Sequence, residues 1–205
     1  MFCLGKPLLA VFVIAALALA GAGSSWAQAP APAPAPPPGQ TETTPPPGTK
    51  PGDPFGEELT LTPKTIIYLK SSATWDSAFE SIQDAFKNVY GYLERQGIKP
   101  AGPAMTIYTA SDDAGFEFQA AVPVAEEPKD QPKGDLAVGK SPDGKALKFM
   151  HRGSYDSLDA AYDSITHYLD ERKLEARDLY IEQYDTDLLK TPEDNLVIEV
   201  LVPIK

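Results

Sequence analysis

The segment TWDSAFESIQDAFKNVYGYLER at residues 74–95 has a counterpart in SYDSLDAAYDSITHYLDE at residues 154–171. In both segments an aromatic residue followed by Asp-Ser opens a stretch in which apolar side chains recur every three or four residues, which predicts an amphipathic helix. Thr74 and Ser154 are suited to cap these helices, and Gly97 is suited to end the first one. The matched ends of the segments predict that the first helix is about one turn longer than the second.

Around the two helices the chain repeats one order of elements. Runs rich in β-branched and aromatic residues predict two strands before each helix and two after it. They are expected at residues 59–61, 65–69, 104–108 and 116–124 in the first half, and at 136–138, 146–150, 180–184 and 196–204 in the second. The closing runs Val122-Pro-Val and Val202-Pro-Ile are offset by 80 residues, like the two helix starts. Matches in one order at nearly one offset indicate an internal duplication.

Such strands, grouped around single helices, predict an α+β domain with an antiparallel sheet. We expect strand–helix–strand–strand halves at about 55–125 and 134–205, both main helices on one face, and a ligand cleft between the halves on the opposite face. The segment from Ser141 to Gly144 is predicted to be a tight turn, because proline presets φ and glycine tolerates a positive φ.

The first 54 residues have a different character. Lys6, an uncharged apolar run at residues 8–20 and the Ser-Trp-Ala triplet ending at Ala27 predict a cleaved signal peptide at 1–27, with an uncleaved membrane anchor as the alternative. Residues 28–54 are rich in proline and predict a disordered linker. The expected location is therefore periplasmic or secreted, with no membrane span after cleavage. Cys3, the sole cysteine, lies within the signal, so the mature chain would lack thiol chemistry.

The net charge of −11 argues against nucleic acid or an anionic membrane surface as a partner. No cofactor and no metal are expected, because the two histidines, His151 and His167, do not form a spaced ligand set. A Gly-x-Ser-x-Gly elbow is also missing from the sequence.

Several quoted runs together resemble the GyrI-like domain, also called the AraC effector-binding domain. They are the Gly153-Ser-Tyr-Asp-Ser-Leu start, the helix end Tyr168-Leu-Asp-Glu-Arg, the strand Tyr180-Ile-Glu-Gln-Tyr, Thr191-Pro-Glu, and the final strand with Val202-Pro-Ile. The resemblance covers about residues 57–205. It implies a duplicated fold that binds small, often cationic or aromatic molecules between its halves, with the family's cleft glutamate at Glu182. Many relatives carry a DNA-binding helix-turn-helix. This chain resembles an exported, stand-alone form instead.

A strand places alternate side chains on one face, so Tyr180, Glu182 and Tyr184 are predicted to share a face. The equivalent strand of the first half contributes Thr106 and Tyr108. One carboxylate among aromatic rings suits a cation, which is attracted by both. The candidate ligand-binding residues are Glu182, Tyr180, Tyr184, Tyr108 and Trp75.

Alternative interpretations remain open at this stage. The same strand pattern also fits an exposed face with a solvated glutamate. The favoured function is an exported binding module for a small cationic or aromatic ligand, and the sequence leaves open whether the protein is also an enzyme. The alternatives are a small hydrolase of electrophiles, in which Glu182 would be the catalytic residue, and a protein–protein adaptor. An exposed sheet edge would allow a homodimer.

Overall fold

The computed structural model describes Lys50 and residues 52–205, which form one sheet and two α-helices. The predicted signal peptide at 1–27 and residues 28–49 of the predicted linker lie outside the described residues. The strands are β1 (Phe55–Leu61), β2 (Thr65–Thr74), β3 (Met105–Ser111), β4 (Gly115–Pro123), β5 (Leu136–Lys140), β6 (Gly144–Arg152), β7 (Tyr180–Tyr184) and β8 (Val197–Pro203). Within the described residues, no helix is both long and apolar enough to cross a membrane.

Each helical segment begins with a 3-10 turn. The turn η1 (Trp75–Ser77) leads into α1 (Ala78–Gln96), and η2 (Tyr155–Ser157) leads into α2 (Leu158–Arg172). Thr74 and Ser154 precede these turns, as the sequence predicts, but neither side chain makes a capping hydrogen bond. Both hydroxyls lie instead against a serine three residues later, at 3.0 Å for Thr74 and 3.4 Å for Ser154.

The helix ends agree with the prediction. Gly97 ends α1 with a φ of 68°, a left-handed conformation that is easiest for a residue without Cβ. Its N–H donates to the carbonyl of Glu94, and the N–H of Ile98 donates to that of Leu93. The helix α1 has 19 residues and α2 has 15, which confirms the expected difference of about one turn.

All eight strands form a single antiparallel sheet in the order β1-β6-β8-β7-β3-β4-β2-β5, which confirms the α+β class. The two halves exchange their first strands: β1 pairs with β6, and β5 pairs with β2. The segment from Ser141 to Gly144 is therefore no hairpin turn, contrary to the prediction, since the strands it joins are not neighbours. Gly144 does adopt the positive φ that the prediction required, 102°.

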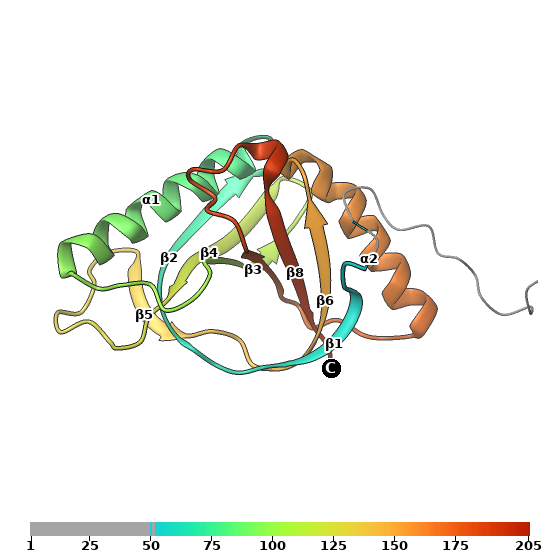
Figure 1. The fold of residues 1–205 in the computed structure, drawn as a ribbon, viewed down its shortest axis with the longest axis horizontal. Coiled ribbons are helices and arrows are strands. Elements are labelled where there is room, and N and C mark those ends of the chain that lie inside the picture. The colour runs from blue at the N-terminus through green and yellow to red at the C-terminus, as the bar shows by residue number, and fades with distance from the viewer. Residues whose placement is uncertain (1–49, 51) are drawn as a thin grey trace, which may run out of the picture. The chain divides into compact units, whose positions relative to one another are not determined.

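Two short connections force the sheet to curl. Residues 62–64 link β1 to β2, and residues 141–143 link β5 to β6, each across six positions of the strand order. In a flat sheet those strands would lie about 29 Å apart at about 4.8 Å per strand. Four Cα steps of about 3.8 Å reach only about 15 Å. The connections run side by side along the lower edge of Figure 1, and the Ser141 N–H donates to the Lys64 carbonyl at 2.9 Å.

Both helices cover the same outer face of the curled sheet, as predicted (Figure 1). Alternate strand residues on that face pack against the helices in the main core, which includes Phe86, Phe118, Phe149, Ile165 and Val200. The opposite face lines the inside of the curl and carries a smaller core of Ile66, Met105, Ile107, Ala121, Ile181 and Leu201. The sheet therefore separates two apolar compartments.

The equivalent strands β3 and β7 pair with each other at the centre of the sheet. Thr106 lies directly opposite Glu182 in this pair. The two residues are also equivalents in the duplication, 76 positions apart. The approximate two-fold axis therefore passes between them, and the fold places Glu182 at the junction of the two halves.

Candidate functional site

Glu182 is the one buried carboxylate side chain among the described residues, with 1% of its surface exposed. Strand alternation puts Tyr180 and Tyr184 on its face, while Ile181 points into the curl. Its face is the one that the helices cover, because the α2 residue Tyr162 bonds to it. The prediction of a cleft on the face opposite the helices is therefore wrong for Glu182. The interior of the curl takes Ile181 and Gln183 of β7, so Glu182, between them, points toward the helices.

Tyrosine hydroxyls surround the carboxylate. The Tyr162 hydroxyl donates to Oε1 at 2.9 Å, and the Tyr184 hydroxyl donates to Oε2 at 3.0 Å. Because Tyr184 gives its proton to the carboxylate, the Thr106 hydroxyl, 2.9 Å away, acts as a donor to Tyr184. The hydroxyls of Tyr108 and Tyr155 lie 2.6 Å apart and form a hydrogen bond with each other beside Glu182. Four tyrosines from β3, η2, α2 and β7 thus enclose one acidic group.

Burial raises the pKa of Glu182, and the hydrogen bonds from the surrounding tyrosines oppose this shift. Burial and the nearby carboxylate raise the pKa of Tyr108, Tyr155, Tyr162 and Tyr184 well above the ordinary tyrosine value, so all four remain protonated donors. In the part of the chain that the structure describes, no Lys, Arg or His forms an ion pair with Glu182. The site therefore has hydrogen-bond donors for its carboxylate but no counterion.

Further rings hold these tyrosines in place. Phe79 of α1 stacks on Tyr155 with centroids 5.2 Å apart, and Phe86 of α1 meets Tyr184 edge to face at 5.7 Å. Tyr162 packs edge to face on Tyr180 at 5.9 Å. Both helices and both halves thus contribute rings around the carboxylate, and such a ring wall attracts a cation.

The structure brings three of the five predicted residues into this cluster: Glu182, Tyr184 and Tyr108. Tyr180 lies at its edge, half-buried against Tyr162. Trp75 lies further out. It is 50% exposed, its Nε1 donates to the carbonyl of Asp112 at 2.8 Å, and its ring packs on Phe116, which in turn contacts Tyr108.

Sequence reasoning missed the roles of Tyr155 and Tyr162. Both lie at helical spacing within the apolar pattern of residues 154–171, a pattern that indicates core residues. Their spacing of seven places both on one side of the helical segment, and in the structure that side faces Glu182. Two hydroxyl-bearing residues on the buried side of a helix, where apolar side chains are usual, were the available signal.

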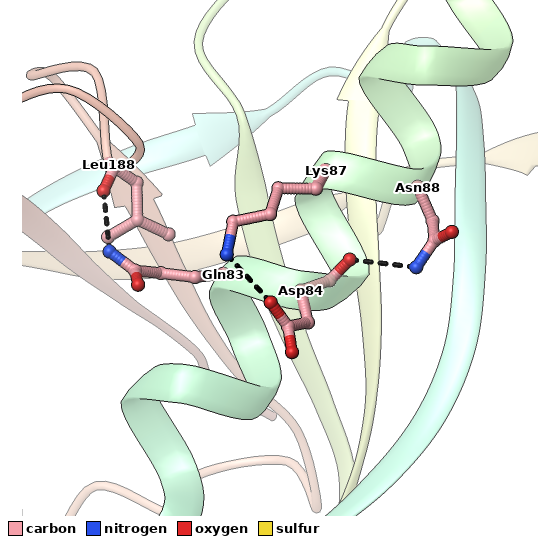
Figure 2. Close-up of polar contacts among 5 residues, drawn as sticks. All are labelled: Gln83, Asp84, Lys87, Asn88 and Leu188. Atoms are coloured by element: carbon pink, nitrogen blue, oxygen red, sulfur yellow. Dashed lines mark hydrogen bonds and ion pairs between the residues drawn. The ribbon is translucent and has the colours of Figure 1, made fainter.

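The loop between β7 and β8 lies across the cluster and ties the two halves together. The Gln83 Nε2 of α1 donates to the carbonyl of Leu188 at 3.1 Å, as Figure 2 shows. At the other end of the loop, Glu193 Oε1 accepts the Tyr155 N–H at 3.2 Å. Leu188 itself is buried. The loop therefore contacts the starts of both helical segments, next to Tyr155 of the cluster.

No group of three or more His, Cys, Asp or Glu side chains that could hold a metal ion occurs among the described residues. His167 is exposed and lies 3.1 Å from Glu171. His151 is buried at the end of β6, where its Nε2 lies 3.1 Å from the carbonyl oxygen of Ser154. Neither histidine contacts Glu182 in the hydrogen bonds of the described region.

His151 makes the stability of the fold depend on pH. Its Nδ1 is buried without a hydrogen-bond partner in the described structure. Burial lowers the pKa of His151, and the bond to the Ser154 carbonyl only partly opposes this. Because the folded pKa lies below the unfolded value of about 6.5, the group stabilises the fold above that pH, and this contribution is lost as the pH falls below it.

We expect the free energy of unfolding to fall between neutral pH and about pH 5 by a larger amount in the wild type than in His151→Gln. Urea unfolding at a series of pH values measures both slopes. The matched control is His167→Gln, which changes the exposed histidine and is expected to keep the wild-type slope. Equal slopes in the wild type and His151→Gln would rule out His151 as the titrating group.

The family of this domain follows from a comparison with protein-family models. The model described as "GyrI-like small molecule binding domain" matches residues 57–205, which is most of the chain. This chain belongs to the GyrI-like family. The membership fits the duplicated halves, and it confirms the resemblance of the quoted runs to this family. A search of curated proteins finds no match to the sequence.

Solved structures show the same fold. The GyrI-like domain described here superimposes on EcmrR in its DNA complex with a TM-score of 0.64 and 14% identity, over 74% of this chain and 57% of EcmrR. The EcmrR C-terminal domain gives a TM-score of 0.61 and 16% identity, over 74% of this chain and 98% of that domain. The structure of SAV2435 bound to tetraphenylphosphonium gives a TM-score of 0.51 and 15% identity, over 74% of this chain and 94% of that protein. This chain thus spans little more than half of full EcmrR, and identities this low show the fold alone.

Proposed function

We propose that this GyrI-like domain is an exported binding protein for a small, cationic aromatic molecule, which is held against Glu182 at the junction of the two halves. The observation that carries the proposal is a carboxylate with 1% exposure that is enclosed by four tyrosines, two of which donate to it, and that has no counterion among the described residues. A buried charge without an opposite charge is costly, and a bound cation supplies the missing partner.

The rings around Glu182 favour an aromatic ligand over an inorganic cation. Ring faces attract organic cations by about 0.5–2 kcal/mol per contact when water is excluded. The stacked pair of Phe79 and Tyr155 comes from different halves, so a flat ligand that separates these rings would contact both. That SAV2435 has been solved with tetraphenylphosphonium, on the same fold, supports this choice of ligand class.

The carboxylate is sealed in the present structure, so binding requires the cover to move. The cover consists of Tyr155, Tyr162, Phe79 and the β7–β8 loop with Leu188. The loop is held by the hydrogen bonds at Gln83 and Glu193, by further hydrogen bonds at its two ends, and by the buried side chains of Leu188 and Leu196. Opening breaks part of this set, and the new contacts of the cation offset that cost.

The experiment is a titration with tetraphenylphosphonium, followed by thermal unfolding and by fluorescence. A ligand that binds the folded state alone stabilises it by RT ln(1 + [L]/Kd), so the unfolding temperature rises with the logarithm of the ligand concentration above the dissociation constant. With tetraphenylphosphonium we expect this rise together with a saturable change in fluorescence, and with the neutral triphenylphosphine oxide we expect neither. Equal responses to the two compounds would show that the charge of the ligand is irrelevant, and would overturn the proposal.

Export is the second part of the proposal and has its own test. The motif ending at Ala27 supports cleavage after that residue, which leaves Gln28 as the first residue of the mature chain. Mass spectrometry of the protein recovered from the compartment outside the cytoplasmic membrane is expected to show a chain that begins at Gln28. An intact N-terminus, or recovery only from the cytoplasm, would contradict export without affecting the binding site.

A further inference from the structure

A cavity of about 310 Å³ lies on the inner face of the curled sheet, on the opposite side from Glu182. It is bounded by the strands β1, β3, β6, β7 and β8 and by the two short connections at residues 62–64 and 141–143. Those connections are hydrogen-bonded to each other, so this end of the curl is fixed. Mouths of curled or closed sheets are common places for small ligands.

The wall of the cavity is mostly aliphatic. Leu59 and Leu61 of β1 face Met105, Ile181 and Leu201 of the central strands. None of the described lining residues carries an aromatic ring. The tyrosine cluster around Glu182 is aromatic, so the two sites favour ligands of different chemistry: aromatic ligands at Glu182 and aliphatic ligands in this cavity.

The wall carries a positive and a negative side chain close together, at distances too long for a strong charged hydrogen bond. The Lys148 Nζ lies 3.6 Å from Glu199 Oε1 and 3.4 Å from Glu57 Oε2, which is longer than the 2.7–2.9 Å of a strong charged hydrogen bond. Glu199 Oε2 accepts one bond, from Gln183 Nε2 at 2.7 Å. The side chains of Lys148 and Glu199 are only 23% and 16% exposed. A cation and an anion are therefore both available to a ligand in a largely desolvated place.

Neighbouring groups shift the pKa values of both side chains. Burial raises the pKa of Glu199, the nearby Asp185 raises it further, and Lys148 opposes the shift. The carboxylates of Glu199 and Glu57 raise the pKa of Lys148 against the effect of burial, so the ammonium form persists. Arg152, the next cation along β6, is already paired with Asp53 at 2.9 Å. Lys64 adds a second positive charge at the exposed mouth.

We propose that this cavity binds a small aliphatic zwitterion, such as a free aliphatic α-amino acid. Its ammonium group pairs with Glu199, its carboxylate pairs with Lys148, and its side chain lies against Met105, Ile181 and Leu201. The two charged groups of an α-amino acid are about 3 Å apart across N–Cα–C–O, which is close to the 3.6 Å between the Lys148 and Glu199 atoms. The ligand therefore lies antiparallel to the Lys148–Glu199 ion pair. Each of its two charged groups then contacts the protein side chain of opposite charge.

The test uses L-leucine as the probe, with two analogues that each lack one charge: 4-methylpentanoate without the ammonium group, and 3-methylbutylamine without the carboxylate. Calorimetric titration of the full chain is expected to detect leucine at millimolar concentration or below, with both analogues at least about tenfold weaker. Equal binding of leucine and either analogue would overturn the proposal, and so would no binding of leucine.

Variants locate the site. Glu199→Gln and Lys148→Met keep side-chain volume and are expected to weaken leucine binding at least about tenfold. Glu117→Gln, at an exposed strand carboxylate, is expected to leave it unchanged. As a readout that does not depend on the variants, the Met105 methyl resonance is expected to shift on addition of leucine to the wild type. A Met105 signal that stays constant during saturable binding would place leucine elsewhere and overturn the proposal.

Discussion

Glu182→Gln is expected to weaken tetraphenylphosphonium binding by about 1–3 kcal/mol, roughly 5- to 150-fold in the dissociation constant. Gln keeps the shape of the side chain and one oxygen acceptor, so the tyrosines retain most of their contacts. What is removed is the negative charge in a place with 1% exposure, where electrostatic attraction is strong because water is excluded. The measurement is the calorimetric dissociation constant of both proteins under identical conditions.

The same substitution is expected to leave the fold intact. A buried carboxylate without a counterion is a cost to the folded state, which the raised pKa of Glu182 already indicates. Glu182→Gln should therefore unfold at the wild-type denaturant concentration or above it. Glu117→Gln serves as the matched control, because this strand carboxylate is exposed. Wild-type affinity in Glu182→Gln, or an equal loss in Glu117→Gln, would remove Glu182 from the site.

Phe86→Ala is expected to give the largest loss of stability, about 3–5 kcal/mol of unfolding free energy. Phe86 has no exposed surface and joins α1 to the sheet in the main core. Its ring also packs edge to face on Tyr184 at 5.7 Å, so the substitution removes a contact that fixes one donor to Glu182. The loss is a large fraction of the stability of a domain of this size, which is typically about 5–15 kcal/mol.

Urea unfolding measures this effect, and the next residue of α1 provides the control. Lys87 is exposed and forms a surface pair with Asp84 at 2.7 Å, visible in Figure 2. Lys87→Ala is expected to change the free energy of unfolding by about 0.5 kcal/mol or less. A loss below about 1 kcal/mol for Phe86→Ala would mean that the packing of α1 against the sheet is not as described.

The sequence predicts the elements well because local signals determine them. The periodic apolar residues of α1 and α2 and the β-branched runs locate the strands and helices, since each pattern reflects one buried side. The duplication adds the equivalence of Thr106 and Glu182. Equivalent strands of a two-fold repeat can meet at its axis. The equivalence of Thr106 and Glu182 is consistent with the central pairing of β3 and β7 in the structure.

Local sequence patterns do not predict that the two halves exchange their first strands, nor which face of the sheet carries Glu182. The run before Ser141 and the run after Gly144 look like a hairpin, and only the competition between partners makes β5 pair with β2 and β6 with β1. Alternation in β7 shows that Glu182 and Ile181 point in opposite directions, but not which of them faces the helices. That choice depends on the curl of the whole sheet, and for the same reason the helical pattern alone does not show that Tyr155 and Tyr162 face Glu182.

The central claim is that Glu182 is the counterion of a bound aromatic cation, and the most direct measurement is a crystal structure of the complex with tetraphenylphosphonium. We predict the phosphonium centre within about 6 Å of the Glu182 carboxylate, with its phenyl rings against Tyr155 and Tyr162 and the β7–β8 loop displaced. Ligand bound elsewhere, with the tyrosine cluster still closed over Glu182, would contradict the account.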